Sequence, residues 1–507
     1  MLKLKRLAFN TAMLTVSSLL MQFLGLAFQV WLVGRIGSSG IGLFGLVMSV
    51  NALASTVAVS GIRFACTRLI SEELGLDRPG SVRRAMRRCL AYSLFFGLAA
   101  AAVLFCFAEP IGFLWVGDAR TVLPLRLLAL SLPLMSLSSV IAGYFTACTR
   151  VYKAAVVQVA EQLSRMAFVA VFLSMAPYGD LELSCAAVVL GGCCGEAAAF
   201  ILSLILYIYD RKRHYSPNAP SGIRLTPRLL GISIPLALSA YARTSLSTIQ
   251  HLLVPRGLRA SGMSADSALS GYGIIQGMVF PIIMFPSCLL AALSQMLVPE
   301  LTAAQVSGKD SDISDVASML LNMCLRFSIG AAILMASFSS ELGIAVYGSA
   351  ESGKYIMLFS LLVPVMYMDM VTDGCLKGLG QMMHSMGINI ADALIGVILV
   401  WLLLPRYALG GYIFMIFVTE CFNFSLSIGH LHRVAQIRIS LPDMILSAVC
   451  ALGASQMSAF IFSLLGFDPA GGKFPLIIAI AAAAAMYMLL IKLLHCGPRY
   501  NGANKTA

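Results

Sequence analysis

Charged side chains inside apolar stretches are the residues of this chain whose chemistry stands out. An ionised side chain at the centre of a membrane-spanning helix costs about 3 kcal/mol on insertion scales, so each one requires a partner or a water-filled cavity. A guanidinium keeps its charge and binds phosphate through paired hydrogen bonds, whereas a carboxylate can take up a proton or Na⁺. Eleven residues are of this kind: Arg63, Arg126, Glu161, Arg165, Glu196, Arg243, Arg326, Asp369, Asp373, Asp392 and Glu420.

Two of these arginines are candidates for binding a phosphate group of a substrate. Arg243 lies near the middle of the apolar stretch 229–252, where it could bind a lipid pyrophosphate or pair with a carboxylate that holds helices together. Arg63 follows the stretch 41–62, where it could meet an entering lipid headgroup or extend to the membrane surface. The sequence leaves both alternatives open for each residue.

Four amide side chains add hydrogen-bonding groups to the predicted spans. In a bilayer such residues commonly join helices by hydrogen bonds. If they face one cavity, they would instead contact the sugar hydroxyl groups of a substrate. These candidate substrate-binding residues are Gln22, Gln29, Asn51 and Gln276.

The intramembrane carboxylates could couple transport to an ion or form structural ion pairs. Glu161 and Arg165 are four residues apart on one helical face and can neutralise each other. Asp369 and Asp373 also share a face, so a proton or Na⁺ could bind there unless Arg326 neutralises them. The same two roles are open to Asp392 and Glu420.

Motifs for catalysis, nucleotides or metals are weak or absent in the sequence. Gly40, Gly42 and Gly45 match the dinucleotide pattern G-x-G-x-x-G, but they open a membrane-length helix and favour close helix packing instead. There is no Walker A motif or nucleophile elbow, and His430 with His432 is a weak metal pair. We therefore predict no catalytic residue, no metal and no cofactor, with H⁺ or Na⁺ as possible coupling ions.

The composition indicates that membrane-spanning helices position these residues. Of 507 residues, 59% are hydrophobic and 11% charged, against roughly 45–50% and about 25% in soluble proteins. Mean hydropathy is +0.88, which disfavours soluble enzymes and nucleic-acid-binding proteins. Because about 20 apolar residues cross the hydrocarbon core, we predict an all-α polytopic protein with about fourteen spans: 8–33, 41–62, 89–108, 122–146, 155–176, 183–208, 229–252, 270–297, 317–338, 354–376, 385–404, 409–430, 441–464 and 474–495.

The basic residues predict the orientation of these spans. With the N-terminus in the cytoplasm, the cytoplasmic segments hold 23 of the 35 Lys and Arg residues and the outer loops hold 7. This asymmetry follows the positive-inside rule and places both termini in the cytoplasm. The net charge of +12 is therefore mainly a feature of orientation and not evidence of a nucleic-acid partner.

An internal repeat divides the chain into two halves. At an offset of 231 residues, three residue pairs correspond: Pro133 with Pro364, Gly143 with Gly374, and Glu161 with Asp392. Six spans in each half make the repeats parallel, which predicts two bundles around a cleft that opens alternately to each side. The predicted domains are a bundle at 1–209, a basic cytoplasmic linker at 210–228, a bundle at 229–432, and two additional helices with a short cytoplasmic tail at 433–507.

Several runs resemble the stage V sporulation protein B and polysaccharide biosynthesis export family of the multidrug/oligosaccharidyl-lipid/polysaccharide superfamily, which includes the MATE transporters. The runs are LPLM at 132–135, GYFTACTR at 143–150, QVAEQLSR at 158–165, LVPRGLR at 253–259, FPIIMFP at 280–286 and GCLKGLG at 374–380. Residues 21–29 carry glutamine and phenylalanine, where relatives that flip the peptidoglycan precursor in Gram-negative bacteria carry arginines.

The resemblance implies a flippase in the bacterial cell membrane. Its expected substrate is an undecaprenyl-linked sugar that moves from the inner to the outer leaflet during cell-wall, spore-cortex or polysaccharide synthesis. A cation-coupled multidrug exporter of the same superfamily is the alternative, and it would present an acidic, aromatic-lined cleft. A membrane-embedded enzyme would need a large outer loop, and every predicted outer loop is shorter than twenty residues. We expect the protein to act as a monomer, with membrane lipid as its other partner.

Overall fold

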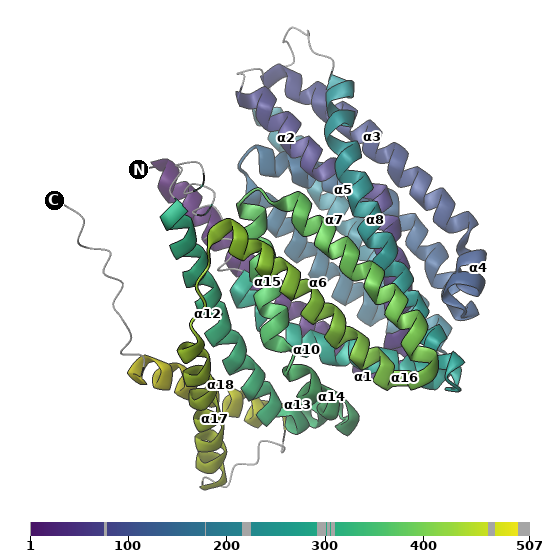
Figure 1. Ribbon diagram of the computed structural model, residues 1–507. Coiled ribbons are helices and arrows are strands. Elements are labelled where there is room, and N and C mark those ends of the chain that lie inside the picture. The colour runs from purple at the N-terminus through teal and green to yellow at the C-terminus, as the bar shows by residue number, and fades with distance from the viewer. Residues whose placement is uncertain are drawn as a thin grey trace, which may run out of the picture. The chain divides into compact units, whose positions relative to one another are not determined.

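The computed structural model describes residues 2–75, 79–177, 179–214, 225–291, 301, 305, 310–464 and 472–494. These residues form helices and turns without a β-strand, which confirms the predicted all-α class (Figure 1). The helices are α1 (Leu2–Val59), α2 (Ile62–Gly75), α3 (Pro79–Cys106), α4 (Ala108–Pro110), η1 (Ile111–Val116), η2 (Ala119–Thr121), α5 (Val122–Ala147), α6 (Val151–Met175), α7 (Leu181–His214), α8 (Leu225–Ala260), α9 (Ala265–Gly273), η3 (Ile274–Val279), α10 (Phe280–Met284), α12 (Asp310–Ser337), α13 (Ser339–Tyr347), α14 (Ala350–Ser360), α15 (Val363–Gly378), α16 (Met382–Ala435), α17 (Leu441–Leu464) and α18 (Lys473–Leu494).

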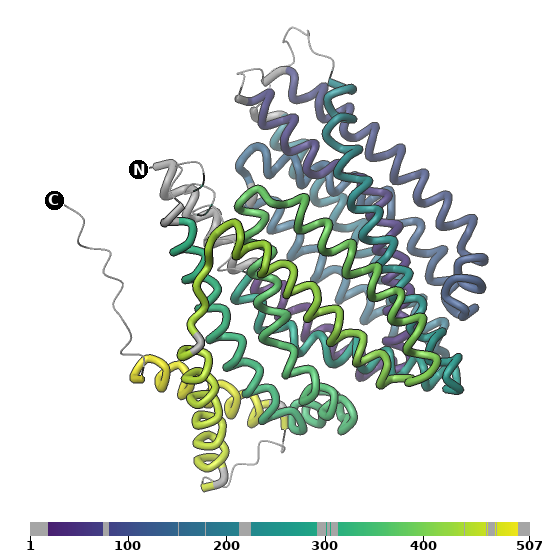
Figure 2. Tube along the Cα trace, in the orientation of Figure 1, coloured from purple at the N-terminus to yellow at the C-terminus, as the bar shows by residue number. Residues whose placement is uncertain are grey.

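Eleven helices in the described part of the chain are long and apolar enough to span a membrane, or twelve when the bent pair α14 and α15 counts as one span. Two of them are too long for a single crossing. The backbone of α1 is non-helical at Gly37, and that of α16 is non-helical at Ala408, where the chain reverses (Figure 2). Twelve of the fourteen predicted ranges therefore fall on one helix or on one arm of a broken helix. The range 270–297 falls on the successive helices α9, η3 and α10, and 354–376 falls on α14 and α15. Residues 292–297 lie outside the described residues.

The chain divides into two compact units. Unit 1 contains Met1–Met278 and Met386–Thr419, and unit 2 contains Val279–Ser385 and Glu420–Ala507. Helices α8 and α9 thus belong to the same unit as the N-terminal helices, although the internal repeat assigns them to the second bundle. Residues 215–224 of the predicted linker lie outside the described residues, and the division into two repeated bundles stays a prediction.

Small residues allow the helices of unit 1 to approach one another closely. A Cβ atom on Gly42 would lie 2.1 Å from the carbonyl oxygen of Leu269, and one on Gly273 would lie 2.1 Å from that of Ser38. The G-x-G-x-x-G run therefore packs α1 against α9, as the sequence favours. In the same way, Gly195 of α7 lies against the backbone of α6.

The additional helices α17 and α18 belong to unit 2, where they pack on α12. Arg326 of α12 pairs with Asp443 of α17 at 2.6 Å. Tyr487 of α18 donates a hydrogen bond to the carbonyl oxygen of Arg326 at 2.5 Å. This arrangement decides one open question, because the carboxylate paired with Arg326 is Asp443 rather than Asp369 or Asp373.

Candidate functional site

Hydrogen bonds along one face of α8 fix its rotation against α1. Thr248 donates to the backbone carbonyl of Ser49 at 2.9 Å, and the hydroxyl groups of Ser60 and Tyr241 lie 2.6 Å apart. The residue numbers rise along one helix as they fall along the other, so the two helices run antiparallel. Residues 241, 244 and 248 of α8 therefore face α1.

Arg243 lies near the middle of the 36-residue helix α8 and on a different face. Its side chain is exposed, and no ion pair joins it to any residue that the structure describes. Gln250, two turns further along this face, contacts Gly396 of α16. Arg243 lies seven residues before Gln250, and Asn389 lies seven residues before Gly396. Since α8 and this arm of α16 run parallel, Asn389 lies at the level of Arg243 on the neighbouring helix.

The four predicted amides do not form one cluster with Arg243. Gln29 donates to the carbonyl oxygen of Gly277 at 3.0 Å, and Gln276 donates to the hydroxyl of Tyr412 at 2.7 Å. These two glutamines thus join helices at one place in unit 1. Asn51 is 8% exposed in the core. Gln22 on α1 and Arg63 on α2 are exposed, and none of these side chains hydrogen-bonds to Arg243 within the described part of the chain.

The pairing predicted from the spacing of Glu161 and Arg165 is present. Their side chains are 2.6 Å apart on α6. The backbone of Arg165 also lies against Gly195 of α7. The next residue, Glu196, is 7% exposed, and it brings a second carboxylate near the same guanidinium.

Unit 2 holds a second group of polar side chains around the predicted acidic pair of α15. Asp373 accepts hydrogen bonds from Lys377 and from Ser385 at the start of α16. Asp369 is half-buried and lies near Ser427, close to the end of α16. Two further predicted residues lie half-buried on α16, Asp392 within unit 1 and Glu420 within unit 2.

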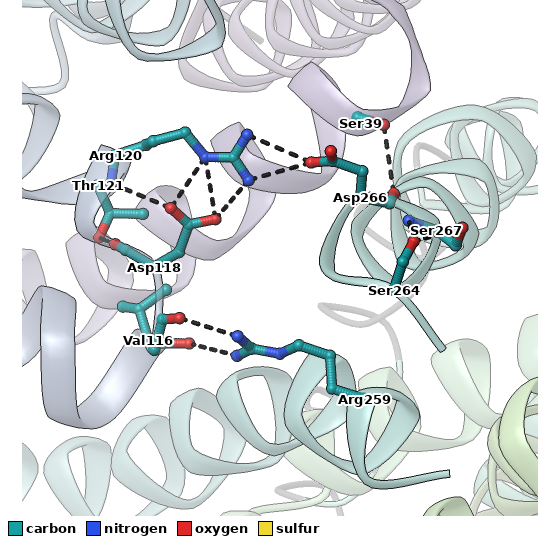
Figure 3. A network of polar contacts seen from close by, with 10 residues as sticks. Ser39, Val116, Asp118, Arg120, Thr121, Arg259, Ser264, Asp266 and Ser267 are labelled. Atoms are coloured by element: carbon teal, nitrogen blue, oxygen red, sulfur yellow. Dashed lines mark hydrogen bonds and ion pairs between the residues drawn. The ribbon is translucent and has the colours of Figure 1, made fainter. Parts of the chain in front are cut away.

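Three connecting segments of unit 1 meet in a network that we call the clasp (Figure 3). Asp118 accepts hydrogen bonds from the side chain of Arg120, whose guanidinium also pairs with Asp266 at 3.2 Å. Ser39 donates to the carbonyl oxygen of Asp266 at 3.4 Å, and the hydroxyl groups of Ser38 and Ser270 lie 2.7 Å apart. The clasp therefore consists of Ser38, Ser39, Asp118, Arg120, Asp266 and Ser270.

The opposite end of α5 carries a second ion cluster, and this one is buried. Asp210 of α7 is 1% exposed and accepts hydrogen bonds from Arg150, from Lys153, and from Tyr144 at 2.8 Å. Burial lowers the pKa of Arg150, but its bond to Asp210 outweighs this effect and leaves the pKa above its ordinary value. The 26-residue helix α5 is about 39 Å long, so the two charged groups lie about one membrane thickness apart.

Comparison with known sequences decides the family. The model of the family described as "Polysaccharide biosynthesis protein" matches residues 7–305. The chain belongs to this polysaccharide biosynthesis protein family. Stage V sporulation protein B of Bacillus subtilis (strain 168) is 24% identical over 493 residues, covering 95% of this chain and 94% of that relative. Lipid II flippase MurJ of the same organism is 21% identical over 425 residues, covering 77% and 75%.

Solved structures show the same fold for this chain. Lipid II flippase MurJ in an inward closed conformation superimposes with a TM-score of 0.71 and 13% identity, covering 94% of this chain and 98% of that one. A multidrug resistance MATE transporter of the MOP superfamily, inward-facing, has a TM-score of 0.64 and 13% identity, covering 82% and 95%. The predicted family is confirmed by the family model, the chain shares the fold of these two structures, and its apolar helices make it a multi-pass membrane protein.

The residues of the clasp were not among the predicted site residues. A signal for it exists, because the positive-inside orientation places residues 34–40, 109–121 and 253–269 on one side of the membrane. The segments 109–121 and 253–269 carry the acidic residues Asp118 and Asp266. Arg120, in the first of these segments, binds both carboxylates. Only the helix packing shows that Asp266 and Arg120, 146 residues apart, meet.

Proposed function

We propose that this protein is a flippase that moves an undecaprenyl-linked sugar from the inner to the outer leaflet of a bacterial cell membrane. The substrate class is a peptidoglycan precursor or another lipid-linked oligosaccharide, for cell-wall, spore-cortex or polysaccharide synthesis. In this proposal the protein acts as a monomer by alternating access, and both termini are cytoplasmic.

The observation that carries the proposal is the exposed guanidinium of Arg243 in the middle of a membrane-length helix. A charge at this depth is unfavourable in lipid, so its exposure supports a position in a polar cleft. A guanidinium matches phosphate oxygens in a bidentate geometry. Arg243 would therefore bind the lipid pyrophosphate, while the prenyl tail stays in the bilayer.

The clasp supports a transport cycle with two states. It joins segments of the first and second predicted repeats at one end of unit 1, and it consists of a few exchangeable polar contacts. Breaking these contacts would let the segments separate at that end. We infer that the clasp closes the outer side, because the positive-inside orientation places its three segments there.

The carboxylates support coupling of this cycle to H⁺ or Na⁺. Glu161, Arg165 and Glu196 place two acidic groups near one guanidinium in unit 1. In unit 2, Asp369 and Asp373 lie one turn apart, and the amine of Lys377 reaches Asp373. Either group would gain a proton or cation during transport.

A cation-coupled multidrug exporter is the second candidate. The likeness to MATE transporters and the carboxylates of α15 favour it, since an acidic site would attract cationic drugs. A cleft with Arg243 exposed would repel such substrates, which favours the flippase.

The deciding experiment compares lipid and drug transport in one reconstituted system. Purified protein in vesicles would be offered a fluorescent lipid-linked sugar or a cationic dye. We expect lipid translocation that falls about tenfold or more in Arg243→Ala and partly recovers in Arg243→Lys. Arg406→Ala, which removes an exposed arginine at the turn of α16, serves as the control. Dye transport without lipid transport would establish the exporter instead.

A further inference from the structure

Two arginines next to the clasp lie at the end of α8, and neither pairs with a carboxylate of the described residues. Arg259 donates hydrogen bonds to the carbonyl oxygens of Gly117 at 2.9 Å and Val116 at 3.5 Å (Figure 3). Arg256 precedes it by one helical turn, so both side chains project from neighbouring positions on α8. No ion pair joins Arg256 or Arg259 to a residue in the described ranges.

Gly117 shows how closely the two guanidinium groups approach the same point. A Cβ atom placed on Gly117 would lie 2.7 Å from a terminal nitrogen of Arg259 and 3.5 Å from Nε of Arg256. Two positive charges thus converge on one stretch of backbone. Within the described residues, the hydrogen bonds that Arg259 makes at this point go to neutral carbonyl groups, which reduce the repulsion little.

The carboxylates of the clasp do not compensate these charges. Asp118 and Asp266 both bind Arg120, whose guanidinium donates a hydrogen bond to each of them. Hydrogen bonds between charged partners are roughly twice as strong as neutral ones. An anion with several oxygens would therefore bind Arg256 and Arg259 more strongly than the carbonyl groups do.

The backbone of this segment explains why the carbonyl groups point at the arginines. The π-helix η1 ends at Val116, and Gly117 adopts a left-handed conformation with φ of 74°. The amides of Gly117 and Asp118 both bond to the carbonyl oxygen of Gly112, at 2.8 and 3.0 Å. This turn leaves the carbonyl oxygens of residues 116 and 117 free to face α8.

We propose that Arg256 and Arg259 form a binding site for a phosphate group at the clasp end of unit 1. In the closed clasp, the carbonyl oxygens of Val116 and Gly117 take the place of phosphate oxygens. When the segment containing Gly117 withdraws, phosphate oxygens replace them. The inference deepens the proposed function, on which it rests, because a lipid pyrophosphate leaving the cleft would meet this site before release.

Binding of phosphate and closure of the clasp would compete in this arrangement. The anion needs the space that the 116–117 backbone occupies, and the clasp holds that backbone through Asp118 and Arg120. Weakening the clasp would therefore increase the affinity for the anion. A purely structural role of the two arginines would have no such consequence.

The test measures binding directly and does not depend on transport. Full-length protein in nanodiscs of phosphatidylcholine would be titrated calorimetrically with inorganic pyrophosphate and, in a second arm, with farnesyl pyrophosphate. We expect pyrophosphate binding that weakens about tenfold in Arg256→Gln and tightens severalfold in Asp266→Asn. Arg126→Gln, which removes an arginine paired with Glu109, should bind like wild type.

The outcomes show whether the site binds a lipid headgroup or phosphate from either source, and they show which result would overturn the proposal. If only the lipid pyrophosphate binds, and Arg256→Gln abolishes this binding, the site is specific for a lipid headgroup. If both probes bind and both lose affinity, the site recognises phosphate from either source. Equal affinities of wild type and Arg256→Gln, or no tightening in Asp266→Asn, would overturn the proposal. A failure of Arg243→Ala to reduce lipid translocation would instead concern the proposed function alone.

Discussion

Gly42 of α1 and Gly273 of α9 face each other so closely that neither position has room for a methyl group. A Cβ atom at either residue would lie 2.1 Å from a carbonyl oxygen of the partner helix. The crossing lies directly beside Ser38 and Ser270, whose hydroxyl groups form part of the clasp. The close approach of α1 and α9 and the polar contacts of the clasp therefore stabilise the same arrangement, in which the clasp is closed.

Gly42→Ala is expected to separate α1 from α9. The added methyl group meets backbone, which cannot move aside as a flexible side chain would, so we expect a loss of about 2 kcal/mol of stability. Thermal unfolding of the purified protein would measure the effect. Gly34→Ala is the matched control, because nothing lies within 4 Å of its Cβ position and alanine favours a helix. Equal unfolding temperatures for the two variants would contradict the close packing.

Asp266→Asn is expected to loosen the clasp. The substitution removes the charge that Arg120 binds across 146 residues of sequence. A disulfide formed between Ser38→Cys and Ser270→Cys, with the exposed Cys106 and Cys421 replaced by serine, would report closure. We expect slower cross-linking in Asp266→Asn. Glu109→Gln breaks an exposed ion pair with Arg126, which contributes about 0–1 kcal/mol, and should leave the cross-linking rate unchanged.

Arg165→Gln is expected to destabilise the protein more than Glu161→Gln. Loss of the arginine leaves Glu161 and Glu196 near each other without a cation, whereas loss of Glu161 leaves Arg165 beside Glu196. Because the Glu161–Arg165 pair is half-exposed, we expect the loss of Arg165 to lower the free energy of unfolding by about 1 kcal/mol. Thermal unfolding would show the difference, and Glu196→Gln should partly rescue Arg165→Gln. If the two single variants unfold alike, the three residues do not act as one group.

Asp210→Asn is expected to weaken the junction of α5, α6 and α7. The buried carboxylate binds Arg150, Lys153 and Tyr144, and an amide cannot compensate the two cations. We expect a loss of about 3 kcal/mol, visible as a lower unfolding temperature. Asp180→Asn, at an exposed position, is the control. Lys153→Gln combined with Asp210→Asn should recover part of the stability.

The spans could be predicted because they depend on local properties of the sequence. Length and continuous hydrophobicity identify a membrane helix without reference to any other part of the chain. The pair of Glu161 and Arg165 could be predicted for the same reason, since four residues separate neighbours on one helical face. The close packing at Gly42 was also indicated by its small neighbours at 40 and 45.

The partners of the other charges depend on packing between distant segments. Arg326 pairs with Asp443, 117 residues away, and not with the acidic residues of α15. Gln29 of α1 and Gln276 of η3 join helices at one place in unit 1. Arg243 lies at another place, exposed on α8. Which side chains meet depends on the rotation and register of each helix, and hydrophobicity specifies these only coarsely.

The sequence by itself determined that this chain is an all-helical membrane protein, where its spans lie and which family it belongs to. These properties follow from composition, length and short motifs. Only the tertiary structure decided that Ser38, Arg120 and Asp266 form a clasp and that Arg259 binds backbone carbonyl oxygens. The physical reason is that a contact between helices requires both a close approach and a matching register, and these arise when the whole bundle packs.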